Sequence, residues 1–255
     1  QRQHIVAEIG DELRGLGRDQ GARLEQVLWL LQNQRRKIPD DPQTISAYNY
    51  ALVRAGKATE ARAEALYLHR LLSPNASPLD ILNSTAGLVD AGLCPFAQQR
   101  IDQLLQRADV EPERVHALAR SIAVRFGELE WYRARFVMTP VSEAARGSAV
   151  IAYLEEHTSL ARWWGKQQRA LEHSIGERVA EAMCGMFIDP EGGATRVVLD
   201  YYTDASSLAE VESLYQRAMD GLMAIYETHP DGPGAFLGEV VVDVHGPEIP
   251  LQELK

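Results

Sequence analysis

Apolar residues recur at helical spacing over most of the first half of this chain. Between residues 5 and 34 they fall every three or four positions, and three glycines interrupt the pattern. Because glycine destabilises a helix interior, the pattern predicts two helices joined near residues 17–21. A single long helix that pairs with a second copy of the chain is the alternative. The apolar stripe on residues 1–36 is therefore expected either to cap the following helices or to form a homodimer.

From residue 41 onward the sequence repeats itself with a period of about 36 residues. The segments ALVRAGKATEAR, GLVDAGLCPFAQ and AVRFGELEWYRAR share apolar positions, and each contains a glycine: Gly56, Gly92 and Gly127. A helix end that needs a left-handed residue explains these glycines. The small residues Ala61 and Ala97 then allow two antiparallel helices to pack closely. The pattern predicts three helical hairpins.

Two further observations support the hairpins. The first helix of a hairpin should face its partner through regularly spaced residues, which are Ile45, Tyr48, Leu52, Ile81, Ser84 and Leu88. Proline is favoured at helix starts and excluded from helix interiors, and it punctuates the hairpin boundaries at Pro74, Pro78 and Pro112.

Residues 41–137 resemble the tetratricopeptide repeat (TPR) family, which stacks helical hairpins of about this period. The chain departs from the family pattern because its period is slightly long and no tryptophan opens each repeat. Tyr132 also replaces the small residue of the third copy. The resemblance implies a concave groove, lined by the first helix of each hairpin, that holds a peptide or a partner helix.

By position, the implied groove residues are Tyr50, Arg54, Asn83, Arg114 and Arg125. Asn83 and Arg114 occupy positions where some family members hold a peptide carboxylate, but Ser46 and Tyr50 stand where that motif expects lysine and asparagine. A generic groove is therefore favoured over a carboxylate clamp. Arg54, Asp90 and Arg125 precede the three turn glycines, and they are interpreted either as solvated surface or as a charge pattern that recognises a partner.

After Pro140 the pattern predicts helices over residues 142–157 and 158–175 and then changes to alternation. Alternating apolar residues predict two strands around a turn at residues 190–193, and Ser207 with Glu210 forms a capping box that opens a long helix. The expected apolar face of this helix is Leu208, Val211, Tyr215, Met219, Leu222 and Tyr226. A last strand is predicted over residues 236–245. The fold class is thus α+β, with a helical-repeat domain at residues 1–140 and a domain of helices plus a ββαβ unit at residues 141–255.

The polar faces of the predicted strands carry several groups that could perform chemistry: Glu181, Arg196, Asp200, Tyr202, Glu239, Asp243 and His245. Carboxylates and an imidazole on one surface are what a divalent metal or a general acid–base pair requires. The same alternation is typical of the solvated side of a half-covered sheet, which is the favoured interpretation. No motif for a metal site, a nucleophile or a phosphate-binding loop is present, so neither cofactor nor metal is expected.

Charge and cysteine content narrow the classes of partner. Residues 1–139 carry 18 basic and 17 acidic side chains, whereas residues 140–255 carry 8 and 19, a net charge of −11. Such an acidic half disfavours nucleic acid as a partner.

Cys94 and Cys184 lie among apolar residues and are interpreted as buried thiols in a reducing compartment. No segment is long and apolar enough for a transmembrane helix, and a cytoplasmic location is the default expectation. Because the sequence begins at Gln1, a removed leader, and with it secretion, stays open.

Two functions follow as hypotheses. The leading one is a non-catalytic adaptor or regulator that holds a protein or peptide in the repeat groove, for example a toxin-neutralising or assembly protein with a basic partner. The alternative is a metal-dependent hydrolase or nuclease that uses Asp200, Glu239, Asp243 and His245.

Overall fold

The computed structural model describes residues 13, 15, 16, 20–136, 149–188, 195–228 and 239–246. In these ranges the chain is mostly helical and carries one small sheet near its C-terminal end, as an α+β fold requires. The elements, in chain order, are α2 (Gly21–Lys37), α3 (Pro42–Arg54), α4 (Ala58–Leu71), α5 (Pro78–Asp90), α6 (Cys94–Leu105), α7 (Pro112–Phe126), α8 (Leu129–Phe136), α10 (Ala149–Glu156), α11 (Thr158–Ile175), the 3-10 turn η1 (Gly176–Arg178), β1 (Val179–Ile188), β2 (Thr195–Thr203), α12 (Leu208–Tyr226) and β3 (Val240–His245). No helix of the described ranges has the length and apolar character needed to cross a bilayer.

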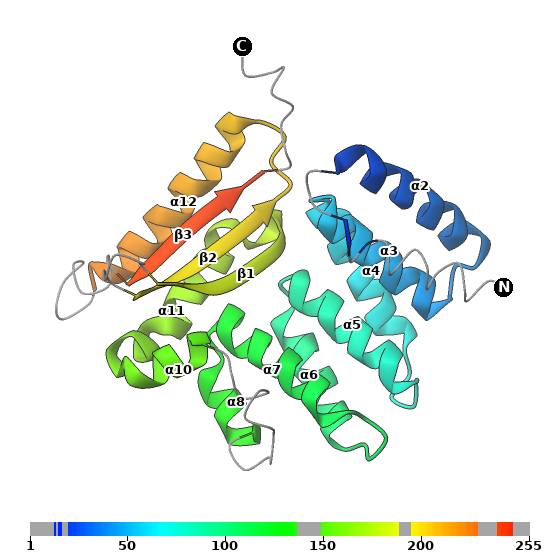
Figure 1. Cartoon of the computed structure of the whole chain (residues 1–255), viewed down its shortest axis with the longest axis horizontal. Helices are drawn as coiled ribbons and strands as arrows, with labels where there is room; N and C mark the ends of the chain where they lie inside the picture. Colours follow the sequence, from blue (N-terminus) through cyan, green and yellow to red (C-terminus); the bar gives the residue numbers. More distant parts are fainter. Residues whose placement is uncertain are drawn as a thin grey trace.

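Consecutive helices from α3 to α8 pair and stack into an arc, and β1 is the strand nearest to its inner side (Figure 1). The helix starts follow local chemistry. Asp41 accepts a hydrogen bond from the Thr44 N–H (2.8 Å), and Ser77 accepts one from the Asp80 N–H (3.2 Å). A proline occupies the first turn of α3, α5 and α7, where its missing N–H costs nothing.

The turns between paired helices confirm the prediction made from the repeated glycines. Gly56, Gly92 and Gly127 have φ of 70°, 71° and 71°, and they are the described residues with positive φ. After α3 the Lys57 N–H reaches the carbonyl of Leu52 at 2.9 Å, and Leu93 repeats this bond to Leu88 at 2.9 Å after α5. Each is the 6→1 bond of a Schellman motif. The same local chemistry therefore gives the same turn twice at equivalent positions.

Close packing within the hairpins also follows the sequence. Ala61 and Ala97 are fully enclosed, and so are Ile45, Leu52, Ile81, Ser84 and Leu88. In the third pair, where Tyr132 replaces the small residue, its hydroxyl lies 2.8 Å from Nε2 of His116. Tyr132 also stacks on Phe136. The larger side chain is thus accommodated by an aromatic cluster between α7 and α8.

The N-terminal stripe packs within the chain. Leu24, Val27, Leu28 and Leu31 of α2 are buried against residues of α3 and α4. Leu16 and Gln20 are not helical and α2 begins at Gly21, so no single continuous helix spans this region. The stripe covers the end of the helical stack, while most residues before Gln20 lie outside the described ranges.

The sheet has the order β1-β2-β3, with β1 and β2 antiparallel and β2 and β3 parallel. Its register aligns Met183, Asp200 and Asp243 in one row across the three strands, and Glu181, Tyr202 and His245 in another. The predicted turn at residues 190–193 and the first part of the predicted last strand lie outside the described residues.

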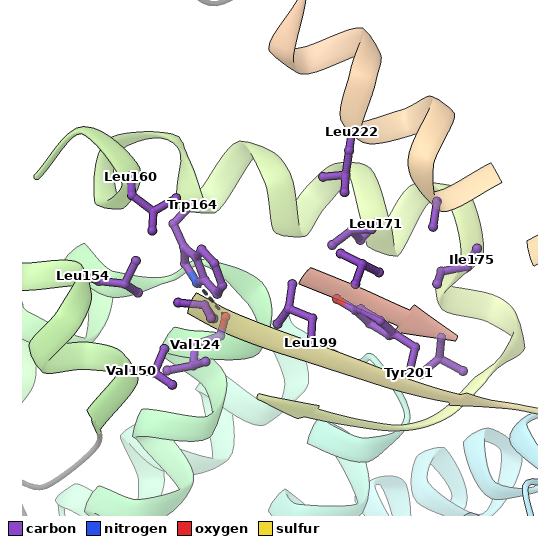
Figure 2. Close-up of a cluster of buried hydrophobic side chains, with 14 of the residues drawn as sticks. Val124, Val150, Leu154, Leu160, Trp164, Leu171, Ile175, Leu199, Tyr201 and Leu222 are labelled. Atoms are coloured by element: carbon purple, nitrogen blue, oxygen red, sulfur yellow. Dashed lines mark hydrogen bonds between the residues drawn. The ribbon is translucent and has the colours of Figure 1, made fainter. Parts of the chain in front are cut away.

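Helices α11 and α12 cover the same face of this sheet, toward which Leu199 and Tyr201 point (Figure 2). The buried stripe of α12 is Leu214, Ala218, Leu222 and Tyr226, whereas Leu208 and Tyr215 are exposed. The predicted apolar face of this helix was therefore partly wrong. Gly221, one turn after Ala218, lies against Ala170 and Ser174 of α11. These small residues let α11 and α12 approach closely, and this approach fixes which stripe is buried.

Helix α11 joins the helical arc to the sheet. The indole N–H of Trp164 donates to the carbonyl of Val124 on α7 at 2.8 Å, and Trp164 is fully buried (Figure 2). Next to it, a side chain on Gly127 would overlap the backbone of Gly165. One core cluster consequently contains Val124 and Leu129 of the arc together with the inner residues of the sheet. The apolar core crosses the domain boundary that was predicted near residue 140.

Candidate binding site

Arginines tie each repeat turn to its neighbours. Arg54 Nη2 donates to the carbonyl of Leu16 at 2.8 Å, and at the equivalent position of the third repeat Arg125 Nη1 donates to the carbonyl of Val89. Arg62 of α4 donates to the carbonyl of Ala91 at 2.9 Å. These acceptors include the last carbonyls of α5, which a helix leaves unsatisfied and which attract positive charge. The arginines therefore connect successive turns.

The same two groove arginines meet acidic residues of the C-terminal half. Arg125 Nε lies 3.5 Å from Oε1 of Glu172 on α11, and Arg54 Nη1 lies 3.9 Å from Oε2 of Glu181 on β1. The Arg125 side chain is only 5% exposed, and its Nη2 has no hydrogen-bond acceptor among the described residues. Both arginines are thus engaged within the chain, and Arg125 is not the solvated surface residue that one interpretation expected.

The other predicted groove residues do not gather around these arginines. Tyr50 is half-buried against the cluster formed by α2 and α3, and Asn83 is half-buried on α5. Arg114 is 57% exposed and pairs with Glu111 at 2.7 Å in the first turn of α7, whereas Arg125 lies in the last turn of that helix. The five predicted groove residues therefore lie on three helices, α3, α5 and α7.

A cleft lies where the inner helices face the sheet. It has a volume of about 430 Å³, within the range of ligand and peptide pockets. It is bounded by α5, α7, α10 and β1, and its lining residues are Ala86, Val89, Asp90, Ala117, Leu118, Arg120, Ser121, Val124, Arg125, Val150, Ala182 and Cys184. The lining is mainly small and apolar, with three charged side chains. Such a surface can hold a peptide segment and orient it by hydrogen bonds.

The thiols near this cleft are not prepared for nucleophilic chemistry. Burial, with a smaller contribution from Asp200, raises the pKa of Cys184 to about 12. Burial also raises the pKa of Cys94 to about 12, with smaller contributions from Glu128 and Glu172. Because the thiolate is the reactive form, both side chains stay protonated near neutral pH.

The polar residues predicted for the strands share one face of the sheet, and this face is partly exposed to solvent. His245 Nε2 lies 2.9 Å from Oδ1 of Asp200, and the ring of Tyr202 stacks on the imidazole. Asp243 stands beside Asp200 in the register. Within the described ranges no group of three or more histidine, cysteine, aspartate or glutamate side chains is arranged to hold a metal ion. The face thus carries one Asp–His hydrogen bond rather than a ligand cage.

Sequence reasoning missed Glu172, Trp164 and Gly165, which connect α11 to the arc. A signal existed in Gly165, since an isolated glycine inside an amphipathic helix often marks a close backbone approach. No protein-family model, no curated protein and no solved structure matches this chain. The function is therefore inferred from the geometry of the cleft and of the sheet.

Proposed function

We propose that this chain is a non-catalytic protein-binding adaptor or regulator, built from a TPR-like repeat with a ββαβ unit on its inner side. The observation that carries the proposal is the cleft of about 430 Å³ between α5, α7 and β1. It lies on the side of the repeat where the family resemblance implies peptide binding. Its apolar lining supplies contact area, and its charged residues can fix the orientation of a bound segment.

The arrangement of the sheet supports this function over hydrolysis. An enzyme needs its acids, bases and ligands to converge around a reacting atom. Asp200 and His245 contact each other on an open face, and Cys184 is held protonated at the cleft. The partner is expected to be a peptide segment with small apolar side chains.

A photo-crosslinking residue at Ser121 tests the proposal, because Ser121 is exposed on α7 and lines the cleft. In cells of the source organism, Ser121 should yield a defined crosslinked protein, while the same residue at Ala63, which is exposed on α4 and does not line the cleft, should not. The absence of a product specific to Ser121 would argue against the cleft as the binding site.

The affinity of the identified partner then gives the quantitative test. Ala117→Trp fills the cleft from an exposed position on α7, and Ala63→Trp is the matched control on α4. We expect Ala117→Trp to weaken binding at least tenfold in calorimetry because it occupies the volume of the ligand, and Ala63→Trp to leave the affinity unchanged. Equal effects of the two variants would sink the proposal.

A further inference from the structure

The second face of the sheet exposes large apolar side chains beside charged ones. Met183 and Phe187 of β1 are 51% and 52% exposed, and in the register they flank a row formed by Gly185, Val198 and Val241. Neither α11 nor α12 lies on this face, since both cover the opposite one (Figure 2). Large exposed apolar residues in one group mark an interaction surface more often than scattered ones do.

Acidic side chains border this apolar group. Asp243 lies on β3 next to Asp200 on β2, and Glu239 precedes β3 beside the beginning of β2. In the described part of the chain neither Asp243 nor Glu239 forms an ion pair. Of the basic groups at this face, Arg196 lies in the row of Phe187, His245 is bonded to Asp200, and Arg54 pairs with Glu181. The face belongs to the half of the chain with net charge −11. Its field therefore attracts a positively charged partner.

We propose that this face, defined by Met183, Phe187, Val198, Asp243 and Glu239, binds a basic amphipathic helix of a partner protein. The apolar side of the helix packs on Met183, Phe187 and Val198, and lysine or arginine side chains at its border reach Asp243 and Glu239. A sheet accepts helices on both faces, so the partner helix completes a second layer opposite α11 and α12. This interaction goes beyond the proposed function because it uses neither the cleft nor the repeat.

The test uses the whole chain and a fluorescein-labelled helical peptide of about 18 residues with leucine on one side and lysine on the other, a length of about 27 Å. Two comparison peptides replace lysine with glutamate, or leucine with serine. Fluorescence anisotropy at low salt should show binding of the lysine–leucine peptide and at least tenfold weaker binding of both comparison peptides. Raising the ionic strength should weaken the binding.

Variants locate the binding on this face. Phe187→Gln should weaken the lysine–leucine peptide about tenfold, because a buried phenylalanine contributes on that order. Leu105→Gln on α6, where the leucine is 43% exposed, is the matched control and should change nothing. Asp243→Asn should reduce both the affinity and its salt dependence. Ala117→Trp should leave peptide binding intact, which separates this surface from the cleft.

Three outcomes would overturn the proposal. They are equal binding by the wild-type and Phe187→Gln chains, equal binding of the lysine–leucine and glutamate–leucine peptides, and a dimer in sedimentation velocity that Phe187→Gln converts to a monomer. The last result would assign the face to a second copy of this chain.

Discussion

At the scale of single residues, Arg125 has a structural role that its predicted place in a binding groove does not indicate. It satisfies the carbonyl of Val89 and pairs with Glu172 while almost fully buried. Arg125→Met keeps the aliphatic volume but leaves the largely buried carboxylate of Glu172 without its cation, and among the described donors the carbonyl of Val89 keeps only the N–H of Gly92. We expect the free energy of unfolding to fall by about 3 kcal/mol in chemical denaturation, as for other broken buried pairs.

The matched control for Arg125 is Arg114, the exposed arginine on the same helix. Arg114→Met removes a surface pair with Glu111 and should change the free energy of unfolding by no more than about 0.5 kcal/mol. Equal losses in the two variants would contradict a structural role for Arg125. Charge reversal at Arg125 should also lower the melting temperature, because it would place an acidic side chain against Glu172.

At the scale of elements, the contact between α7 and α11 depends on glycine. Gly127 and Gly92 share a φ of 71°, so alanine has the same backbone cost at both positions. A β-carbon on Gly92 meets the carboxylate of Glu172 at 3.0 Å, which can rotate away, whereas one on Gly127 overlaps the backbone of Gly165. We expect Gly127→Ala to lose about 2 kcal/mol more stability than Gly92→Ala in chemical denaturation. Losses within about 0.5 kcal/mol of each other would show that the two helices can separate at little cost.

Local features of the elements could be predicted from the sequence, whereas features that depend on packing between elements could not. The turn at Gly92 is set by residues within six positions of each other, so the sequence alone predicts it. The buried stripe of α12 depends on how closely Ala218 and Gly221 approach α11, which a single helix pattern does not encode. Pattern reasoning therefore succeeds where the partner of a residue is local.

The candidate site was less predictable for the same reason. The arginines at positions 54 and 125 could be chosen from the repeat, but their acidic partners are distant in sequence, and Glu172 is 47 residues from Arg125. The cleft itself exists because β1 is placed against α5 and α7. No periodicity in the sequence specifies that placement.

At the scale of the whole molecule, the shared core predicts a single unfolding event. Val124 and Leu129 of the arc pack with Trp164, Leu171 and Leu199 in one cluster. Far-UV circular dichroism and tryptophan fluorescence should therefore give the same midpoint in guanidinium chloride, as a two-state transition does. A chain that ends at residue 140 exposes part of this cluster and should be less stable by several kcal/mol.

Two separated transitions, one of them at the midpoint of the shortened chain, would instead show that the halves fold independently. That result would support the predicted domain boundary near residue 140.

The path of α11 across the repeat has a mechanical consequence. In a stack of helical hairpins each unit contacts only its neighbours, so small rotations add up and the whole stack can bend and stretch like a spring. Here one rigid rod touches the third turn at Gly165 and the second turn at Glu172, seven residues or about 10 Å further along. Because α11 is held at both turns, it fixes the distance between them. The arc is therefore stiff between its second and third turns, and it should resist stretching there more than an unbraced stack of helical hairpins does.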